Sequence, residues 1–457
     1  MLFGRGAGRW TAPLLICAFL GFAEQPESVD AVVQSATHQI QNGNFRAAAG
    51  LLRESLKKFP ADPTLWNLLG ISATELHDKA AAIDAFEHGL KLAPKSPELY
   101  ENLGLFYYRD ADYPSAKKYL SKAVALGSDK PSVAFSLDAA KIRTGEPESG
   151  LADLIRLEPS LGNVADYWDE RGWVEIHRDS RAADSSFEHV LLIAPEDLRA
   201  LNGAAAVAEV QKNDEKALSF LIRAKQAHPD DVDTLMHFGA VCIRRDLTVD
   251  ALQALEQAHK LDPSNNGALY LYARSEIGLQ HWQQAYDLFS EFARRVPKFA
   301  PTYYALGWLD LKMNRTAEAR KELGRCLALE PNYADSRYEL GQLDLNEGNL
   351  DAAEKELLTA VKQNPHHAKA NVALGDLMLR KGNLADAESY YRAAIAAEPS
   401  SGAAHYKLSV VLSRLKRSEE AGKERLLGIQ LQAKEHENSR VLMELATPDG
   451  TPLSAAP

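Results

Sequence analysis

The sequence predicts an all-α fold, a solenoid of about 12 antiparallel helix pairs with a period of 34 residues. Three features recur at this spacing and carry the prediction. The first is a proline, at Pro195, Pro229, Pro263, Pro297, Pro331, Pro365 and Pro399, with Pro60 and Pro94 also 34 residues apart. The second is a small residue, at Ala205, Gly239, Ala273, Gly307, Gly341, Gly375 and Ser409. The third is an alanine, at Ala217, Ala251, Ala285, Ala319, Ala353, Ala387 and Ala421.

Each of these residues has a packing role in a pair of short helices. In the unit that contains Gly307, apolar residues recur at helical spacing around the glycine and again after Ala319. The small residue and the alanine let the two helices approach closely. The proline ends the second helix because its nitrogen carries no hydrogen to donate. One helix–turn–helix unit is therefore copied along the chain.

A 34-residue helix–turn–helix unit that ends in proline resembles the tetratricopeptide repeat family. We count the residue three after each proline as position 1. The family pattern then has Trp or Leu at position 4, Leu at 7, Gly at 8, Ala at 20, Phe or Tyr at 24, Ala at 27 and Pro at 32. One unit follows this pattern almost throughout, with Trp66, Leu69, Gly70, Ala82, Phe86, Gly89 and Pro94. The resemblance covers roughly residues 29–430 and implies a right-handed superhelix with a concave groove lined by the first helix of each repeat.

Residues 1–23 differ from the repeats and predict a cleaved secretory signal peptide. Arg5 and Arg9 precede an apolar run from Ala12 to Ala23, and polar residues follow at once. The run is shorter than the about 20 apolar residues that span a bilayer, so a retained membrane anchor is the less favoured alternative. We expect cleavage near Ala23 and export of the mature chain, either to a periplasm or out of the cell. Any membrane contact would be peripheral or through an uncleaved signal segment.

The remaining chain is expected to form four segments. Residues 24–127 form N-terminal repeats, residues 128–195 form two degenerate repeats, and residues 196–430 form the regular array with a C-terminal capping helix. Residues 431–457 form a partly disordered tail, because its end is rich in Pro, Gly and Ala. In the degenerate segment the spacing falters, and the sequence TGEP at residues 144–147 makes a strong break between helices. Both a bend there and simple sequence drift within a continuing superhelix fit this pattern.

Composition and motifs favour a binding protein without catalytic activity. The formal net charge is −11 and the sequence has no basic stripe or aromatic RNA-binding motif, so nucleic acid is disfavoured as a partner. It also has no GxxxxGK phosphate loop, HExxH zinc pair, CxxC pair or GxSxG nucleophile turn. We therefore expect no cofactor, no metal and no catalytic residues. Cys242 and Cys326 fall at core positions of repeats that are not neighbours, and we expect free, buried thiols.

The family resemblance implies that positions 2, 5, 9, 12 and 13 of each repeat line the groove. Position 5 is aromatic in four repeats, and position 9 of several repeats adds polar or aromatic side chains. The candidate partner-binding residues are Tyr270, Arg274, Tyr304, Trp308, Tyr338, Gln342 and Tyr406. The rings would bury area against a peptide, the hydroxyls would bond its backbone, and Arg274 would pair with a carboxylate. Alternatively, the tyrosines fill space against the next helix and only their hydroxyls reach solvent.

Together these features predict a non-enzymatic, exported scaffold that holds a protein or peptide partner in its concave groove. Its role would be in assembly or secretion at the cell envelope. The alternative is an accessory protein that handles polysaccharide, because Tyr and Trp faces on a concave surface also suit sugar stacking. A regulatory subunit whose partner is an enzyme is compatible with the first hypothesis.

Overall fold

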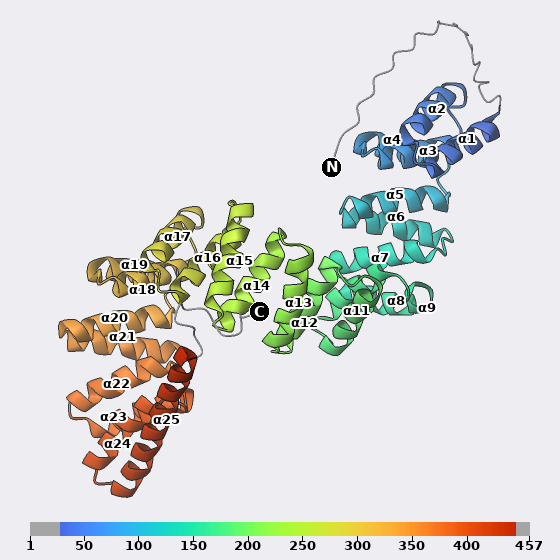
Figure 1. The fold of residues 1–457 in the computed structure, drawn as a ribbon. Helices are drawn as coiled ribbons and strands as arrows, with labels where there is room; N and C mark the ends of the chain where they lie inside the picture. Colours follow the sequence, from blue (N-terminus) through green and yellow to red (C-terminus); the bar gives the residue numbers. More distant parts are fainter. Residues whose placement is uncertain (1–27, 445–457) are drawn as a thin grey trace, which may run out of the picture. The chain divides into compact units, whose positions relative to one another are not determined.

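A computed structural model describes residues 28–444 of the protein, with side chains as far as Ala433. Over this range the chain forms 25 helices and no strand (Figure 1). Consecutive helices pack in pairs, and one short additional helix, α9 (Glu158–Leu161), interrupts their order. The all-α fold of paired helices is therefore confirmed. The predicted signal segment and the chain end from Thr447 lie outside the described residues.

The chain divides into two compact units between Gln211 and Lys212. Besides α9, the helices of the first unit are α1 (Val29–Gln41), α2 (Phe45–Lys58), α3 (Pro63–Glu75), α4 (Lys79–Leu92), α5 (Pro97–Arg109), α6 (Tyr113–Ala125), α7 (Pro131–Arg143), α8 (Pro147–Arg156), α10 (Ala165–Glu175), α11 (Ser180–Ile193) and α12 (Leu198–Val210). Those of the second unit are α13 (Asp214–Ala227), α14 (Val232–Arg244), α15 (Thr248–Leu261), α16 (Asn266–Gly278), α17 (Trp282–Arg295), α18 (Ala300–Lys312), α19 (Thr316–Leu329), α20 (Ala334–Glu347), α21 (Leu350–Gln363), α22 (Ala368–Arg380), α23 (Leu384–Ala397), α24 (Gly402–Arg414) and α25 (Ser418–Glu444).

Local sequence explains where the helices begin and end. The Asp62 carboxylate accepts bonds of 2.9 and 3.1 Å from backbone N–H groups in the first turn of α3, and Pro63 occupies the first helical position. Ser96 and Pro97 begin α5 in the same way. Pro60 lies two residues after the end of α2, where it cannot continue the helix. Capping residues therefore start the first helices, and the repeated prolines follow the second helices.

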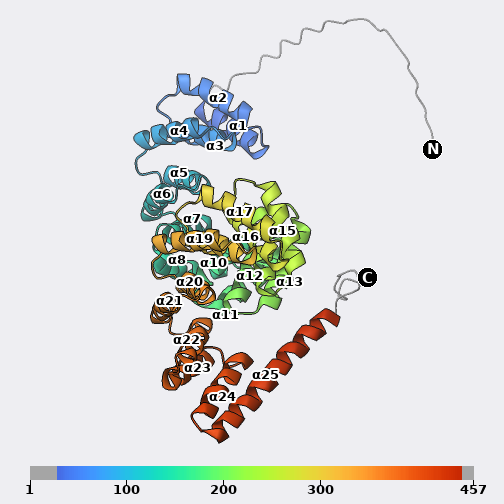
Figure 2. The same ribbon diagram turned by 90° about the vertical axis from the view of Figure 1, so that its left-hand side faces the viewer.

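Within each unit, consecutive helices pack in pairs, and each pair packs on the next (Figures 1 and 2). The core is accordingly a series of small clusters between helix layers. In the first unit, Phe86 of α4 packs with Leu99 and Leu103 of α5. In the second unit, Phe289 of α17 packs with Leu306 of α18 in the same manner. Each repeat therefore buries its apolar face only against its immediate neighbours.

The small residues at position 8 set the distance between the two helices of a repeat. A Cβ atom added to Gly307 would lie 2.7 Å from the Leu323 side chain, and one added to Gly375 would lie 2.6 Å from the Tyr391 ring. Tyr391 is fully buried, and its hydroxyl donates to the Asp376 carboxylate at 2.6 Å. This bond holds the ring in place against the glycine.

Residues 128–195 are helical, as their apolar spacing predicts. Helices α7 and α8 form one pair, and α10 and α11 form the next. Pro159, which arrives early in the repeat pattern, lies in the first turn of the additional helix α9. Gly172 of α10 packs against Phe187 of α11 and supplies the close helix approach of this repeat. The extra helix accounts for the irregular spacing, and a bend in this segment stays a prediction.

The last helix, α25, is 27 residues long and continues beyond the end of α24 (Figure 2). Residues 431–444, which the sequence assigned to a partly disordered tail, are therefore helical. Three large apolar side chains on this helix, Leu426, Leu427 and Ile429, are exposed. The capping helix thus combines charged residues with exposed apolar ones.

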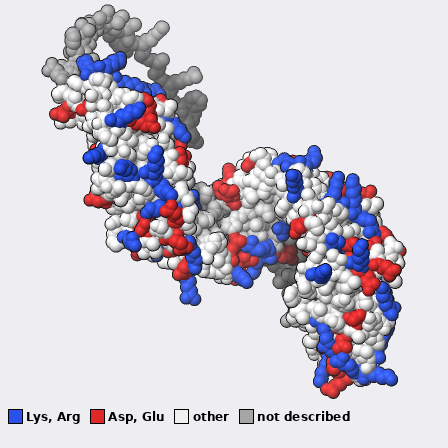
Figure 3. Space-filling model, turned by 180° about the vertical axis from the view of Figure 1, so that it is seen from behind, with Lys and Arg blue, Asp and Glu red and all other residues white. Residues whose placement is uncertain are grey.

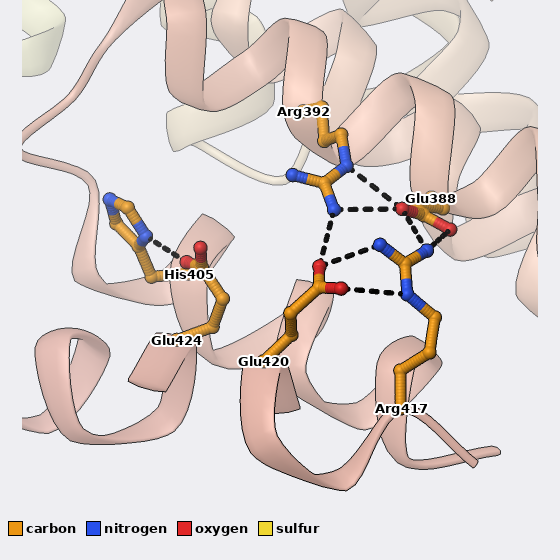
Figure 4. A network of polar contacts seen from close by, with 6 residues as sticks. All are labelled: Glu388, Arg392, His405, Arg417, Glu420 and Glu424. Atoms are coloured by element: carbon orange, nitrogen blue, oxygen red, sulfur yellow. Dashed lines mark hydrogen bonds and ion pairs between the residues drawn. The ribbon is translucent and has the colours of Figure 1, made fainter. Parts of the chain in front are cut away.

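A network of ion pairs joins the last two repeats (Figure 4). Arg417, in the turn before α25, contacts Glu388 of α23 at 2.7 Å and Glu420 of α25 at 2.6 Å. Arg392 of α23 contacts the same two carboxylates at 2.8 and 3.1 Å. Hydrogen bonding and charge from Arg417 lower the pKa of Glu420 below its ordinary value. Because the four charges are linked, they hold α25 to α23 more firmly than isolated surface pairs would.

We expect opposite effects from the same substitution at two glycines. Gly375→Ala forces a methyl group onto the fixed Tyr391 ring and should lower the free energy of unfolding by about 1–3 kcal/mol. A Cβ atom added to Gly324 of α19 meets nothing within 4 Å. Gly324→Ala should therefore raise the free energy of unfolding by about 0.5–1 kcal/mol. Urea unfolding followed by circular dichroism measures both. Equal effects at the two sites would contradict a packing role for position 8.

Candidate functional site

The predicted partner-binding residues of the second unit lie on the first helices of successive repeats. Positions 5 and 9 are four residues apart, so their side chains share one face of a helix. Tyr270 and Arg274 share a face of α16, and Tyr304 and Trp308 share a face of α18. Two pairs of candidate residues are thus placed on neighbouring repeats.

These four residues line a single pocket of about 350 Å³. The remaining lining residues are Ile277, Phe289, Pro301, Ala305 and Tyr333. The walls therefore come from α16, α17, α18 and the turn before α20. The lining is mainly aromatic and aliphatic, with phenol, indole and guanidinium groups as its polar side-chain groups. This composition is typical of a site that buries an apolar group and orients it through a few polar contacts.

Tyr270 packs on three phenylalanine rings. Its ring centroid lies 5.5 Å from that of Phe289, 5.2 Å from Phe292 and 5.6 Å from Phe299. Edge-to-face and tilted contacts of this kind hold an aromatic ring in a defined orientation. Tyr270 therefore fills space between helices and lines the pocket at the same time. The packing role expected of the position-5 tyrosines therefore holds for Tyr270, whereas its role in partner binding stays a prediction.

The α18 rings are also supported by neighbouring aromatic residues. The Tyr304 centroid lies 5.3 Å from that of Tyr333, and the Trp308 centroid lies 5.6 Å from that of Trp282 on α17. The Lys312 ammonium lies 4.8 Å from the centre of the Trp308 ring. Tyr304 and Trp308 are half-buried, so each presents part of its ring to the pocket.

Burial keeps the pocket hydroxyls protonated. It raises the pKa of Tyr270 and of Tyr304 above the ordinary value of a phenol, and it raises the pKa of Tyr333 to about 12. Within the described part of the chain, none of these three hydroxyls has a hydrogen-bond partner. They are therefore neutral at physiological pH and free to donate to an acceptor on a ligand.

Arg274 is exposed at the edge of the pocket and forms no ion pair with any residue that the structure describes. Many other cations are paired. Arg320, for example, contacts Asp344 and Glu347, both at 3.0 Å. On the face shown in Figure 3, lysines and arginines are interspersed with acidic residues. The guanidinium of Arg274 is thus a free positive charge beside an apolar pocket.

The other three predicted residues do not line this pocket. The Tyr338 ring lies against His367, with 5.1 Å between centroids. Gln342 is half-buried on α20, and Tyr406 on α24 is 45% exposed. The seven candidates therefore divide into four residues that come together and three that lie outside the pocket.

Two aromatic residues that the sequence analysis did not select, Phe299 and Tyr333, complete the surroundings of the pocket. They lie 34 residues apart, immediately before position 1 of their repeats. Asp231 and Asn265 occupy this place in the two preceding repeats and cap their helices, whereas neither aromatic side chain does so. The sequence signal for both residues is an aromatic side chain, in two consecutive repeats, at the position where the preceding repeats have a helix-capping residue.

The described residues include no group of three or more His, Cys, Asp or Glu side chains arranged to hold a metal ion. The two cysteines in this range, Cys242 and Cys326, are free and buried, which confirms the expectation from their repeat positions. Burial raises the pKa of Cys242 to about 12 and also raises that of Cys326. Both therefore remain neutral thiols at physiological pH.

No helix between residues 28 and 444 is both long enough and apolar enough to cross a lipid bilayer.

Asp310, two residues beyond Trp308 on α18, is a buried charge with weak compensation. Its side chain is fully buried, and neither carboxylate oxygen has a hydrogen-bond partner among the described residues. The Arg315 guanidinium lies 3.8 Å away. Burial raises the pKa of Asp310 to about 6; Arg315 opposes this shift, and Glu322 and Glu318 add to it. The pocket helix therefore has an acidic group that destabilises the fold when ionised.

Comparisons with known proteins identify the repeat. A family model for the tetratricopeptide repeat matches residues 33–97, 70–131, 304–368, 338–401 and 372–429. The chain is 24% identical over 305 residues to the protein CTR9 homolog of Arabidopsis thaliana, a match that covers 57% of this chain and 28% of that protein. It is 27% identical over 105 residues to an N-terminal acetyltransferase A complex subunit-like protein of Schizosaccharomyces pombe, covering 23% of this chain and 15% of that protein. The chain thus matches less than a third of the length of either relative.

Among solved structures, the chain is similar to one in the crystal structure of the APC/C hetero-tetramer Cut9–Hcn1. The sequence identity is 15%, the match covers 91% of this chain and 89% of that one, and the TM-score is 0.45.

We expect the stability of the protein to respond to Asp310 in a pH-dependent way. The folded state raises this pKa from 3.8 to about 6, so it binds more protons than the unfolded state between these values, and stability falls as the pH rises through that window. Asp310→Asn should therefore raise the free energy of unfolding by about 2 kcal/mol at pH 7.5, and this gain should vanish near pH 4. Urea unfolding at several pH values measures it.

Asp344 is the matched control, because it occupies the same repeat position on α20 and contacts Arg320 at 3.0 Å. Asp344→Asn removes a partnered carboxylate and should lower stability at pH 7.5. A gain in stability from both substitutions, or from neither, would show that Asp310 is not an uncompensated charge.

Proposed function

Because this chain is a tetratricopeptide repeat protein, and such repeats form scaffolds for protein–protein interaction, we propose that its second unit binds a peptide segment of a partner protein on the face formed by α16, α18 and α20. The anchor of this interaction is the pocket lined by Tyr270, Arg274, Tyr304 and Trp308. The partner segment lies across neighbouring repeats and inserts one apolar side chain between the rings.

The main support for peptide binding is the pocket itself. Its volume of about 350 Å³ is near the lower end of the roughly 300–1,000 Å³ typical of ligand sites, which suits one or two side chains. Tyr, Trp and Arg are the residues most enriched at the energetic centres of protein interfaces. Their support by Phe289, Trp282 and Tyr333 also reduces the entropy lost when a partner binds.

The proposed role is that of a scaffold without catalysis. The polar side-chain groups of the pocket are phenols with raised pKa values, an indole and a guanidinium. None of these is poised as a nucleophile or a general base at neutral pH. The pocket therefore suits recognition of a partner.

We further propose that the protein acts outside the cytoplasm, in assembly or secretion at the cell envelope. The support is the segment of residues 1–23, with Arg5 and Arg9 followed by a short apolar run. A role in handling polysaccharide is the second candidate, favoured by the partly exposed rings of Tyr304 and Trp308. Both candidates use the same pocket, so binding experiments decide between them.

Panning a random phage-displayed peptide library on the full chain tests the main proposal. We expect a family of related peptides to be enriched. Trp308→Ala and Tyr304→Ala should each weaken binding of the best peptide by roughly thirty-fold, which corresponds to about 2 kcal/mol for truncation of an anchor residue. Isothermal titration calorimetry measures the dissociation constants, and circular dichroism confirms that the variants remain folded.

Tyr406→Ala is the matched control, because Tyr406 is a position-5 tyrosine outside the pocket. It should change the dissociation constant less than two-fold, on the order of the effect of a contact outside the binding centre. If Tyr304→Ala and Tyr406→Ala weaken peptide binding equally, the peptide is bound by the row of position-5 tyrosines and the pocket is not its anchor. Failure to enrich any peptide, together with retention of an oligosaccharide on a glycan array, would favour the second candidate.

Export predicts a defined mature N-terminus. When the full chain is expressed in a bacterium, we expect the periplasmic fraction to contain a protein that begins at Glu24, measured by intact-mass spectrometry. Leu15→Arg places a charge in the apolar run and should keep the uncleaved chain in the cytoplasm. An unprocessed protein found in the cytoplasm without this substitution would contradict export.

A further inference from the structure

We propose that the pocket selects a peptide in which a large apolar side chain lies next to an acidic residue. The apolar side chain enters between Tyr304 and Trp308, and the neighbouring carboxylate binds the guanidinium of Arg274. This inference rests on the proposed function and names the chemistry of the partner segment.

The polar groups of the pocket are suited to a ligand that accepts hydrogen bonds. Tyr270, Tyr304 and Tyr333 present hydroxyls that stay protonated and have no partner within the described residues. The Trp308 indole nitrogen can only donate, and so can the Arg274 guanidinium. No Asp or Glu side chain is among the lining residues. A carboxylate with a neighbouring peptide carbonyl therefore matches the pocket better than an amine does.

Arg274 supplies the charge that makes this preference specific. Other exposed arginines of the second unit, such as Arg380, also form no ion pair among the described residues, but Arg274 is the arginine that lines the pocket. On the following repeats, Arg325 contacts Glu322 at 3.0 Å and Arg337 contacts Glu356 at 2.9 Å. Arg274 has no such contact in the described structure. A planar guanidinium can bind a carboxylate through two parallel hydrogen bonds, which favours an acidic side chain over other acceptors.

The neighbouring repeats also give the ligand a direction. Arg274 lies on α16, and the rings of Tyr304 and Trp308 lie on α18 together with a second cation, Lys312. The acidic side chains of Asp335 and Glu339 lie on α20. Burial raises the pKa of Glu339, and electrostatic attraction from Lys369 and Lys312 opposes that shift. An acidic residue of the ligand would thus be attracted at the α16 side of the pocket and repelled at the α20 side. We infer that the carboxylate lies toward α16.

The net charge of −11 acts against this partner only at long range. In physiological salt, charges separated by more than about 8 Å are largely screened, whereas a direct guanidinium–carboxylate contact beside an apolar pocket is screened much less. Local charge at Arg274 therefore outweighs the general acidity of the chain for a peptide that is already docked. The expected partner differs from the basic one that net charge alone would favour.

A charge exchange tests the inference. The probe is the phage-displayed peptide most enriched on the full chain, resynthesised with its acidic residue unchanged, changed to the amide, or changed to lysine. We expect the amide probe to bind about ten-fold more weakly than the acidic one, as for loss of a charge-assisted bond of about 1.4 kcal/mol. With Arg274→Glu, the order should reverse, and the lysine probe should bind most tightly. Calorimetry measures each pair.

Arg380→Glu is the matched control. Arg380 is also exposed on a first helix of the second unit and forms no ion pair among the described residues, but it does not line the pocket. This variant should keep the order of the three probes unchanged. Arg380→Glu changes the net charge by the same amount as Arg274→Glu. It therefore distinguishes the effect of direct contact with residue 274 from the effect of net charge on peptide binding.

The outcomes separate this inference from the proposed function. Enriched peptides that depend on Trp308 but have neutral or basic residues beside the apolar one would overturn the acidic preference and leave peptide binding intact. If a probe loses binding only when its C-terminal carboxylate is amidated, that terminal carboxylate binds Arg274, and the proposed preference for an acidic side chain is wrong. If no peptide is enriched, the proposed function itself fails.

Discussion

The close approach of the two helices within each repeat is the constraint on which the rest of the structure depends. Glycine, alanine or serine at position 8 and alanine at position 20 leave room for one large side chain of the second helix, such as Leu323 against Gly307 or Tyr391 against Gly375. With that distance fixed, successive first helices present the same positions to the same side, 34 residues apart. A residue type repeated at positions 5 and 9 therefore becomes a surface feature that spans several repeats. The pocket between α16 and α18 is such a feature.

The pocket illustrates how packing and recognition use the same side chains. Tyr270 lies on Phe289, Phe292 and Phe299, and Trp308 lies against Trp282, so the rings that face a ligand are fixed before it arrives. A site fixed in advance loses little entropy on binding. The same helix, α18, also contains Asp310, whose buried and poorly paired carboxylate destabilises the fold. Local instability next to a binding surface is common in proteins whose function requires a particular arrangement of side chains.

Much of the fold could be predicted from the sequence because a 34-residue period encodes contacts that repeat. The helix pairs, the packing glycines and the buried thiols Cys242 and Cys326 all follow from position within the repeat. The candidate site was predicted only in part, because its shape depends on contacts that differ between repeats. At the place of capping residues, Tyr333 lines the pocket and Phe299 packs on Tyr270. In contrast, Tyr338 lies against His367, and Tyr406 lies outside the pocket. The additional helix α9 and the length of α25 likewise have no counterpart in the repeat pattern.

The proposed function requires the pocket of the second unit to anchor a partner peptide. The most direct test is a crystal structure of the full chain bound to its most enriched peptide. We expect an apolar side chain of the peptide between Tyr304 and Trp308, with a carboxylate in contact with Arg274. A peptide bound elsewhere, with the pocket occupied only by solvent, would contradict it.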